Sequence, residues 1–180
     1  EDTSDYFGSS VSISDDGSTV AITGPNNDGY DTNTGHTRIY RYNPTNQQWT
    51  LFGAEIDGTT TGENFGTSVS MNAEGNIVAV GAPGVSAGHT RIYAYNSSGN
   101  RWDLLGNEIV GEASGDESGT AVSLSDAGNT VAIGAPKNSN VGSFSGHTRI
   151  YQYDSNASDW KKLGIDIDGE KIKEYNLYPS

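Results

Sequence analysis

The sequence predicts an all-β fold built from three copies of one unit, and three observations support this. The hexapeptide Gly-His-Thr-Arg-Ile-Tyr occurs three times, at residues 35–40, 88–93 and 146–151. Each copy is followed by a second Tyr and then by a Trp, namely Trp49, Trp102 or Trp160. Short alternating runs flank the hexapeptides, and no segment has helical periodicity. Recurrence at this spacing is typical of an array of one supersecondary unit.

Each unit opens with a predicted β-hairpin. Its first strand is an alternating run at 10–13, 68–71 or 121–124, with one small-residue face and one apolar face. A turn containing Gly17, Gly75 or Gly128 follows, because Gly tolerates the positive φ of a tight hairpin. The returning strand, at 20–22, 78–80 or 131–133, runs into a Pro that stops it.

The second half of each unit holds two further strands. The connection before the hexapeptide varies in length, at 26–34, 84–87 and 137–145, whereas the hexapeptide strand itself is constant. A polar hairpin leads to the fourth strand, at 49–52, 102–105 or 160–163. We expect the acidic segments 55–58, 108–111 and 166–169 to link one unit to the next.

Four short antiparallel strands per unit of this length describe a blade of a β-propeller. The predicted blades are 1–58, 59–111 and 112–169, and 170–180 is a tail that is a candidate closing or inter-subunit strand. Closed propellers have about four to eight blades, so three blades form a partial or half propeller. Three alternatives remain open: a longer ring, a pairing with three blades of another chain, or open edges that join subunits.

The Phe-Gly and Gly-Pro pairs of the units carry a family resemblance. Phe7-Gly8 precedes Gly24-Pro25, and Phe65-Gly66 precedes Gly81-Ala82-Pro83, whereas the third unit has Ser118 in the Phe position. These motifs resemble the FG-GAP repeat, the blade unit of integrin α-subunit propellers and of many secreted adhesion proteins. Calcium-binding members of that family carry an Asp-rich loop that these turns lack, because one or two carboxylates cannot supply six to eight oxygen ligands. The sequence therefore predicts no metal site and no cofactor, and it leaves weak calcium binding in the loops open.

Composition excludes several classes of partner. The net charge of −13 and the absence of a dense Lys and Arg cluster argue against nucleic acid. No Cys is present, so disulfides and thiolate metal sites are excluded. No apolar run approaches the roughly 20 residues of a membrane helix, and no signal peptide is visible at Glu1. We therefore expect no membrane insertion, and a chain that is either mature or a fragment.

The repeated His and Arg residues lie two apart on one face of the third strand. They are His36, His89, His147, Arg38, Arg91 and Arg149. Strands are spaced about 4.8 Å apart, so third strands lie far from the ring axis and their His residues cannot share one ion. We expect structural, inter-blade roles, with each Arg paired to a repeated acid and covered by a Tyr ring. The candidate acids are Asp5, Glu63 and Asp116 before the first strand, and Glu55, Glu108 and Asp166 after the fourth.

Antiparallel strand order places the variable connections and the inter-unit segments at one end of the blades. Loops on a rigid scaffold are common binding sites, and Asp28, Tyr30, Asp31 and Phe144 are the candidate ligand-binding residues there. Loop variation without function is the alternative. Asn96 and Asn156 begin acceptor sequons for N-glycosylation at the opposite hairpin tips.

No catalytic motif is recognisable, and nearly every chemically active residue is repeated, whereas a catalytic group should be unique. The sequence therefore predicts a non-enzymatic extracellular protein, structural or adhesive, that assembles through blade edges into a cell-surface or filament assembly. The alternatives are a carbohydrate-binding propeller module and a non-catalytic part of a secreted glycosidase. Expected partners are a second copy or another propeller segment, and a glycan or surface protein.

Overall fold

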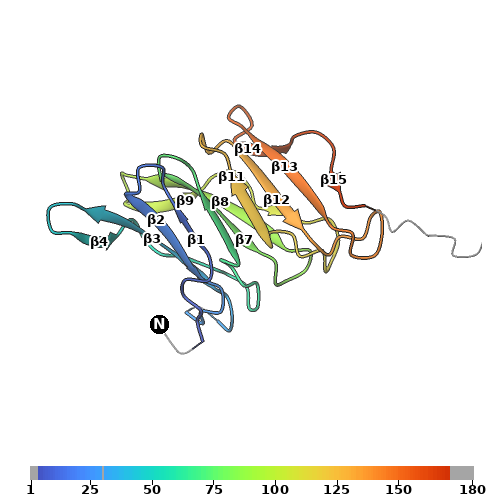
Figure 1. The fold of residues 1–180 in the computed structure, drawn as a ribbon, viewed down its shortest axis with the longest axis horizontal. Coiled ribbons are helices and arrows are strands. Elements are labelled where there is room, and N and C mark those ends of the chain that lie inside the picture. Colours follow the sequence, from blue (N-terminus) through green and yellow to red (C-terminus); the bar gives the residue numbers. More distant parts are fainter. Residues whose placement is uncertain (1–3, 30, 171–180) are drawn as a thin grey trace, which may run out of the picture.

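A computed structural model describes residues 4–29 and 31–170. Within these residues every regular element is a strand, and no helix is present that could cross a membrane. The strands form three antiparallel sheets that stand side by side along the molecule (Figure 1). The fold is therefore the predicted all-β array of three propeller-type blades.

Each blade runs outward in chain order from its first to its fourth strand. The first blade contains β1 (Val11–Ile13), β2 (Thr19–Gly24), β3 (His36–Asn43), β4 (Gln48–Leu51) and β5 (Ile56–Asp57). The second contains β6 (Ser68–Met71), β7 (Ile77–Ala82), β8 (His89–Asn96), β9 (Arg101–Leu104) and β10 (Ile109–Val110). The third contains β11 (Ala121–Leu124), β12 (Thr130–Ala135), β13 (His147–Asp154), β14 (Asp159–Lys162) and β15 (Ile167–Asp168).

The outer strand of each blade is interrupted by a glycine. β4 pairs with the second half of β3, and β5 pairs with His36 and Thr37 at its start. Between them the chain turns at Gly53, whose φ of 81° lies in the left-handed region that favours glycine. The segment 55–58 therefore extends the fourth strand of its own blade before the chain enters the next unit. The other two blades repeat this arrangement.

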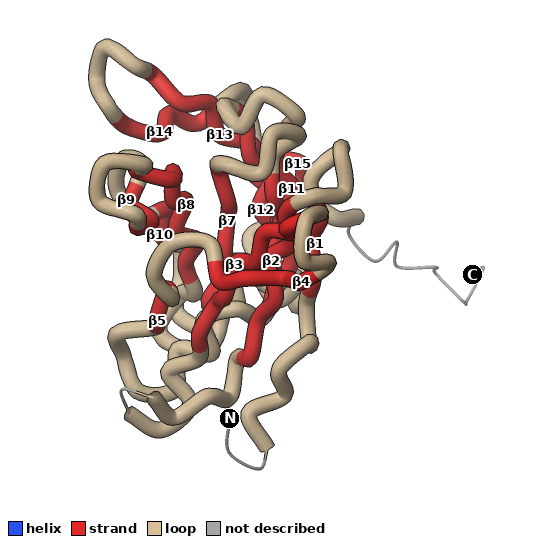
Figure 2. Tube along the Cα trace, turned by 90° about the vertical axis from the view of Figure 1, so that its left-hand side faces the viewer, coloured by secondary structure: helices blue, strands red, loops and turns tan. Residues whose placement is uncertain are grey.

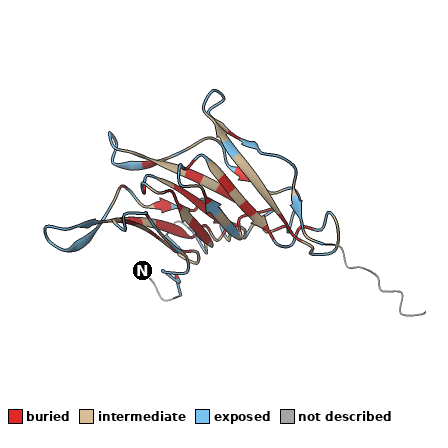
Figure 3. Ribbon diagram, turned by 45° about the horizontal axis from the view of Figure 1, so that its top comes forward, coloured by how far each residue is buried: buried red, intermediate tan, exposed pale blue. Residues whose placement is uncertain are grey.

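Neighbouring blades pack a small-residue face against an apolar face. Ser10 Oγ, immediately before β1, and Ser12 Oγ on β1 accept hydrogen bonds from the backbone N–H groups of Val69 and Met71 on β6. Ser70 does the same for Leu124 N on β11. The apolar side chains fill two cores, one between each pair of blades. Figure 3 shows the buried residues concentrated inside the array, while the outer tips are exposed.

A Phe-Gly pair and a Trp anchor the second blade to the first. Phe65 is fully buried, and its backbone N–H donates to Thr34 O in the loop before β3. Trp102 Nε1 donates a hydrogen bond of 2.8 Å to Phe52 O on the outer edge. The third blade repeats the Trp anchor, since Trp160 Nε1 donates to Leu105 O at 2.7 Å. There Ser118 replaces the Phe, and its N–H donates to Ala87 O.

Candidate functional site

The variable connections and the starts of β3, β8 and β13 lie at one end of the blades. For the first blade, Figure 2 shows these loops in the lower part of the view, below β3. Hydrogen bonds link neighbouring blades there. Thr61 Oγ1 donates to Asp31 Oδ2 at 2.6 Å, and Asn64 Nδ2 donates to Pro25 O at 3.4 Å. We call this end the loop end.

In the middle blade the repeated Arg is held by two carboxylates. Arg91 Nη2 lies 3.1 Å from Glu63 Oε2, and Arg91 Nε lies 2.6 Å from Glu108 Oε2. Glu63 is fully buried, and His89 Nε2 lies 3.2 Å from its Oε2. Burial alone would raise the pKa of Glu63, but hydrogen bonds involving His89, the Thr59 backbone and Arg91 outweigh it and lower the pKa to about 2. The buried Glu63 is therefore ionised at neutral pH.

The first blade repeats this arrangement with different acids. Arg38 Nε donates to Glu55 Oε2 at 2.7 Å, and His36 Nδ1 lies 3.2 Å from Glu55 Oε1. Asp5, expected as an Arg partner, accepts a hydrogen bond from Asn27 Nδ2. Burial, followed by the charge of Glu55, raises the pKa of Asp57. The repeated His and Arg thus lie in an acidic surrounding in this blade as well.

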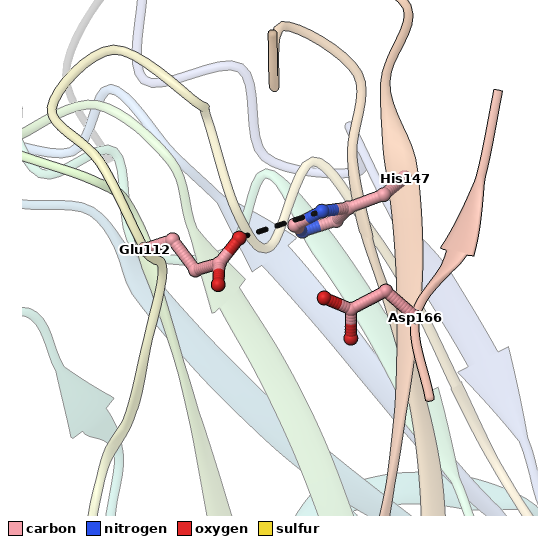
Figure 4. Close-up of side chains that lie close together, drawn as sticks. All are labelled: Glu112, His147 and Asp166. Atoms are coloured by element: carbon pink, nitrogen blue, oxygen red, sulfur yellow. Dashed lines mark ion pairs between the residues drawn. The ribbon is translucent and has the colours of Figure 1, made fainter. Parts of the chain in front are cut away.

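The third blade brings together Glu112, His147 and Asp166 (Figure 4), and Arg149 pairs with both carboxylates; we call these four residues the blade-3 cluster. Arg149 donates two hydrogen bonds to Asp166, from Nε to Oδ1 at 3.0 Å and from Nη2 to Oδ2 at 2.9 Å. Arg149 Nη2 also pairs with Glu112 Oε1, and His147 Nδ1 lies 3.8 Å from Glu112 Oε2. Hydrogen bonds from Arg149 lower the pKa of Glu112, and they lower that of Asp166 to about 2.

Glu112 was missed by the sequence argument, which considered only acids at repeated positions. Glu112 directly follows Gly111, as Thr59 directly follows Gly58, so the two residues hold the same repeat position. Thr59 Oγ1 likewise accepts a hydrogen bond from the repeated Arg of its blade. Asp116, the acid expected there, accepts hydrogen bonds from Asn138 Nδ2 and Ala113 N. The signal that could have found Glu112 is the acid that the first and third units share at this repeat position, Glu1 and Glu112, six residues before Phe7 and Ser118.

Phenylalanine rings, which the sequence argument did not consider, lie near two of the guanidinium groups. Arg38 Cζ lies 5.7 Å from the centre of the Phe7 ring, and Arg91 Cζ lies 5.7 Å from that of Phe65. This distance permits a cation–π interaction. The Phe of each Phe-Gly pair precedes the first strand and folds back onto the third strand of its own blade, which the linear pattern does not reveal.

The blade-3 cluster offers one imidazole nitrogen and two carboxylates within 4.8 Å of one another, a set that can hold a metal ion. Arg149 already provides a positive charge to both carboxylates. A divalent ion would have to displace that guanidinium, so the donor set does not favour a metal. The cluster is better suited to hydrogen bonding with a polar ligand.

The expected ligand-binding loop residues are only partly available to a ligand. Asp28 Oδ1 accepts from Asn33 N at 2.7 Å, and Asp31 accepts from Thr32 N and from Thr61 Oγ1, so both acids stabilise their own loop end. Phe144 is 68 % exposed and has a φ of 51°. Tyr30 and the tail at 171–180 lie outside the described residues.

The two sequon asparagines lie at the hairpin tips opposite the loop end. Asn96 Nδ2 donates to Asp103 Oδ2 at 2.7 Å, and the Asn156 N–H donates to Asp154 Oδ1 at 2.9 Å. Asn156 is exposed, whereas Asn96 is half-buried. The Asn96 side chain would have to leave Asp103 to accept a glycan.

No family model and no curated protein matches the chain. Among solved structures, a candidate 6-phosphogluconolactonase from Bacteroides fragilis aligns with a TM-score of 0.61 at 10 % identity, over 89 % of this chain and 39 % of its own. The periplasmic gluconolactonase of Pseudomonas aeruginosa gives 0.57 at 14 % identity, over 86 % and 42 %. Sqt1 of Saccharomyces cerevisiae gives 0.55 at 14 % identity, over 91 % and 35 %. The chain thus spans about two fifths of the length of these similar structures.

These similarities correct two expectations. The prediction of an extracellular adhesive or structural assembly protein, with its glycan-binding and glycosidase alternatives, is contradicted by neighbours that are named as lactonases. The prediction that the chain is not an enzyme is contradicted for the same reason. In the third blade the repeated His and Arg meet Glu112, at a repeat position where the sequence has Glu1 in the first unit and Thr59 in the second.

Proposed function

We propose that this chain forms three blades of a lactonase-type propeller and that its loop end binds and hydrolyses the cyclic ester of a sugar acid. The support from the fold is the alignment with two proteins named as lactonases, over 89 % and 86 % of this chain. The support from the chain itself is the blade-3 cluster, which lies at the loop end where a ligand can approach.

We choose the blade-3 cluster over the equivalent group in the middle blade because Glu112 is exposed. The Glu112 side chain is 35 % exposed, whereas that of Glu63 in the middle blade is fully buried. Asn140 Nδ2 donates to Glu112 Oε2 at 2.7 Å, which brings an amide from the variable loop to the same place. A sugar lactone carries several hydroxyl groups, so carboxylate and amide groups at one exposed point suit its recognition.

Hydrolysis of a lactone adds water to the ester carbonyl carbon, breaks the ring C–O bond and delivers a proton to the departing oxygen. A group that accepts a proton from water and a positive group near the carbonyl oxygen accelerate these steps. In our proposal Glu112 orients the attacking water, His147 accepts its proton and returns it to the departing ring oxygen, and Arg149 stabilises the negative oxygen that forms at the carbonyl. Nδ1 of His147 has no hydrogen-bond partner among the described residues and lies 3.8 Å from Glu112 Oε2, so in this proposal the proton reaches it through the half-exposed Glu112.

The test is the hydrolysis of glucono-δ-lactone, followed by acid release at constant pH with the spontaneous rate subtracted. The wild-type chain should exceed the spontaneous rate. Glu112→Thr, which gives the third blade the residue of the second, should lower kcat/KM by about 10²-fold, a usual size for loss of a group in general acid–base catalysis. Glu117→Gln, which alters an exposed ion pair with Lys137, is the matched control and should leave the rate unchanged.

Circular dichroism must show that both variants retain the wild-type fold. A wild-type rate equal to the spontaneous rate, together with no change in the His147 imidazole signals on addition of a gluconolactam, would contradict the proposal. Equal losses in Glu112→Thr and Glu117→Gln would also count against it.

The finer family assignment and the location belong to the same proposal. Phe65 of the second Phe-Gly pair is fully buried, and its N–H donates to Thr34 O of the first blade; this packing of the pair supports an FG-GAP-like repeat. One of the similar proteins is named as periplasmic, which supports a secreted or periplasmic location. Fractionation of the source cells with an antibody against the chain would test the location.

A further inference from the structure

Among the described residues, nothing covers the outer face of the first blade or that of the third. The first blade exposes the side chains that should cover a preceding blade, and we call this surface the leading face: Phe7, Gly8, Val11, Ile13 and Trp49. The third blade leaves exposed or half-buried the groups that should receive a following blade, and we call this surface the trailing face: Ser123, Gly134, Leu163 and Gly164. The two outer blades lie at opposite ends of the array (Figure 1).

The Trp anchor gives the first match between these faces. Trp102 and Trp160 are each 7 % exposed, because each fills a niche over a glycine of the preceding blade. A Cβ on Gly53 would lie 2.8 Å from Trp102 Nε1, and one on Gly106 would lie 2.9 Å from Trp160 Cδ1. The equivalent Gly164 has nothing within 4 Å of such a Cβ, and the equivalent Trp49 is 44 % exposed. Among the described residues, the trailing face thus has a Trp site over Gly164 that no Trp fills, and the leading face has Trp49 without such a site.

The Phe-Gly pair gives the second match. Gly8, Gly66 and Gly119 share nearly the same φ, at 99°, 97° and 92°. A Cβ on Gly66 or Gly119 would meet the preceding blade, whereas one on Gly8 would meet nothing within 4 Å. The trailing face holds a cavity of about 440 Å³ at the corresponding place, lined by residues that include Gly134, Gly146 and Thr148.

The serine ladder gives the third match. Ser12 and Ser70 each accept a hydrogen bond from the first strand of the next blade, from Met71 N and Leu124 N. Ser123 holds the same repeat position on the trailing face and is exposed. Ile13 holds the position of Met71 and Leu124 on the leading face and is 58 % exposed. The leading face also has an apolar hollow of about 300 Å³, lined by Phe7, Val20, Ile22, Tyr40 and Trp49.

We infer that a second copy of this chain seats its leading face on the trailing face of the first, and the reverse, so that two copies close a ring of six blades. The contacts would repeat those already formed between blades within one chain, at the same repeat positions. Six blades lie within the range of about four to eight that closed propellers adopt. Two identical contacts related by a two-fold axis also leave no open edge for further addition. This inference does not depend on the proposed activity.

The first experiment measures molar mass by light scattering against protein concentration, in about 0.15 M salt so that the negative charges are screened to about 8 Å. The wild-type chain should give a dimer. Trp49→Ala should raise the dissociation constant by at least about 30-fold, the usual effect of removing a central interface Trp. Gly134→Ala should also raise the dissociation constant. The equivalent Gly81 lies directly against Gly119 of the next blade, so an added methyl group at Gly134 should collide with the second copy. Within its own chain this methyl group has room, because its nearest neighbour lies 3.6 Å away.

The matched control is Val110→Asp. Val110 is 53 % exposed on an outer edge, away from both open faces, and the other two blades have Asp at this position. It should leave the dimer unchanged. A wild-type chain that stays monomeric at every concentration, or a dimer that responds equally to all three variants, would overturn the inference.

A cysteine pair distinguishes a ring from a filament, since the chain has no Cys of its own. Oxidised Ser123→Cys/Ile13→Cys should run as a covalent dimer on a denaturing gel without reductant, because the two positions face each other only between copies. Each single variant should form the dimer far less efficiently. A ladder of higher multimers, or a double variant that links no better than the single ones, would contradict the closed ring.

Discussion

At the scale of single residues, the middle blade depends on a buried charge pair. Glu63 is fully buried and accepts hydrogen bonds from Arg91 Nη1 and Nη2. Removing one partner of such a pair leaves the other buried without compensation, which costs about 3–5 kcal/mol. An exposed pair such as Lys137 with Glu117 contributes only about 0–1 kcal/mol.

We therefore predict that Glu63→Gln lowers the free energy of unfolding by about 3 kcal/mol at pH 7. The folded pKa of Glu63 lies near 2, below its ordinary value of 4.5. Its stabilisation is therefore complete above about pH 4.5 and is lost as the pH falls towards 2. Urea denaturation at pH 7 and at pH 3 should show a smaller difference between variant and wild type at the lower pH. Glu117→Gln is the control, and equal effects of the two variants would contradict this account.

At the scale of elements, the outer strand of each blade combines a glycine turn with a niche for the next Trp. Gly106 and Gly164 have almost the same φ, 77° and 78°, so an added side chain strains the backbone equally at both. Only Gly106 has a Trp over it. The difference between the two sites therefore isolates the packing between blades from the conformation of the turn.

We predict that Gly106→Ala destabilises the monomer by about 1–3 kcal/mol more than Gly164→Ala does, since the new methyl group overpacks against Trp160. Chemical denaturation at protein concentrations low enough for the monomer gives both values. The two variants should share the cost of the positive φ. Equal free energies of unfolding would mean that Trp160 does not need this niche.

At the scale of the whole molecule, the described residues form a one-dimensional array in which strand contacts join the first blade to the second and the second to the third. The middle blade is covered on both faces. Val78, Val80 and Ile92 on β7 and β8 are fully buried. The outer blades each have one open face in the described chain, so their strands should open more readily.

Hydrogen exchange should reveal this gradient. In the monomeric chain, amides of β7 should exchange more slowly than those of the equivalent strands β2 and β12, because exchange from β7 requires loss of two interfaces rather than one. Mass spectrometry of peptides from the three strands would measure it. Uniform protection in a chain kept monomeric by Trp49→Ala would show that the blades open together and would contradict the array.

The amino-acid sequence alone was sufficient for the all-β class, the three blades and their four strands, because hydrophobic alternation, turn glycines and the repeated hexapeptide are local signals. It also placed His36, His89, His147 and the three Arg residues on one face of the third strand, since that follows from the period of a strand. It did not find Glu112, and it did not consider the Phe rings that lie near two of the guanidinium groups. Those contacts were decided by tertiary structure, because they depend on how the segment before each blade folds back at the loop end, and proximity between side chains so far apart in the sequence has no local signature.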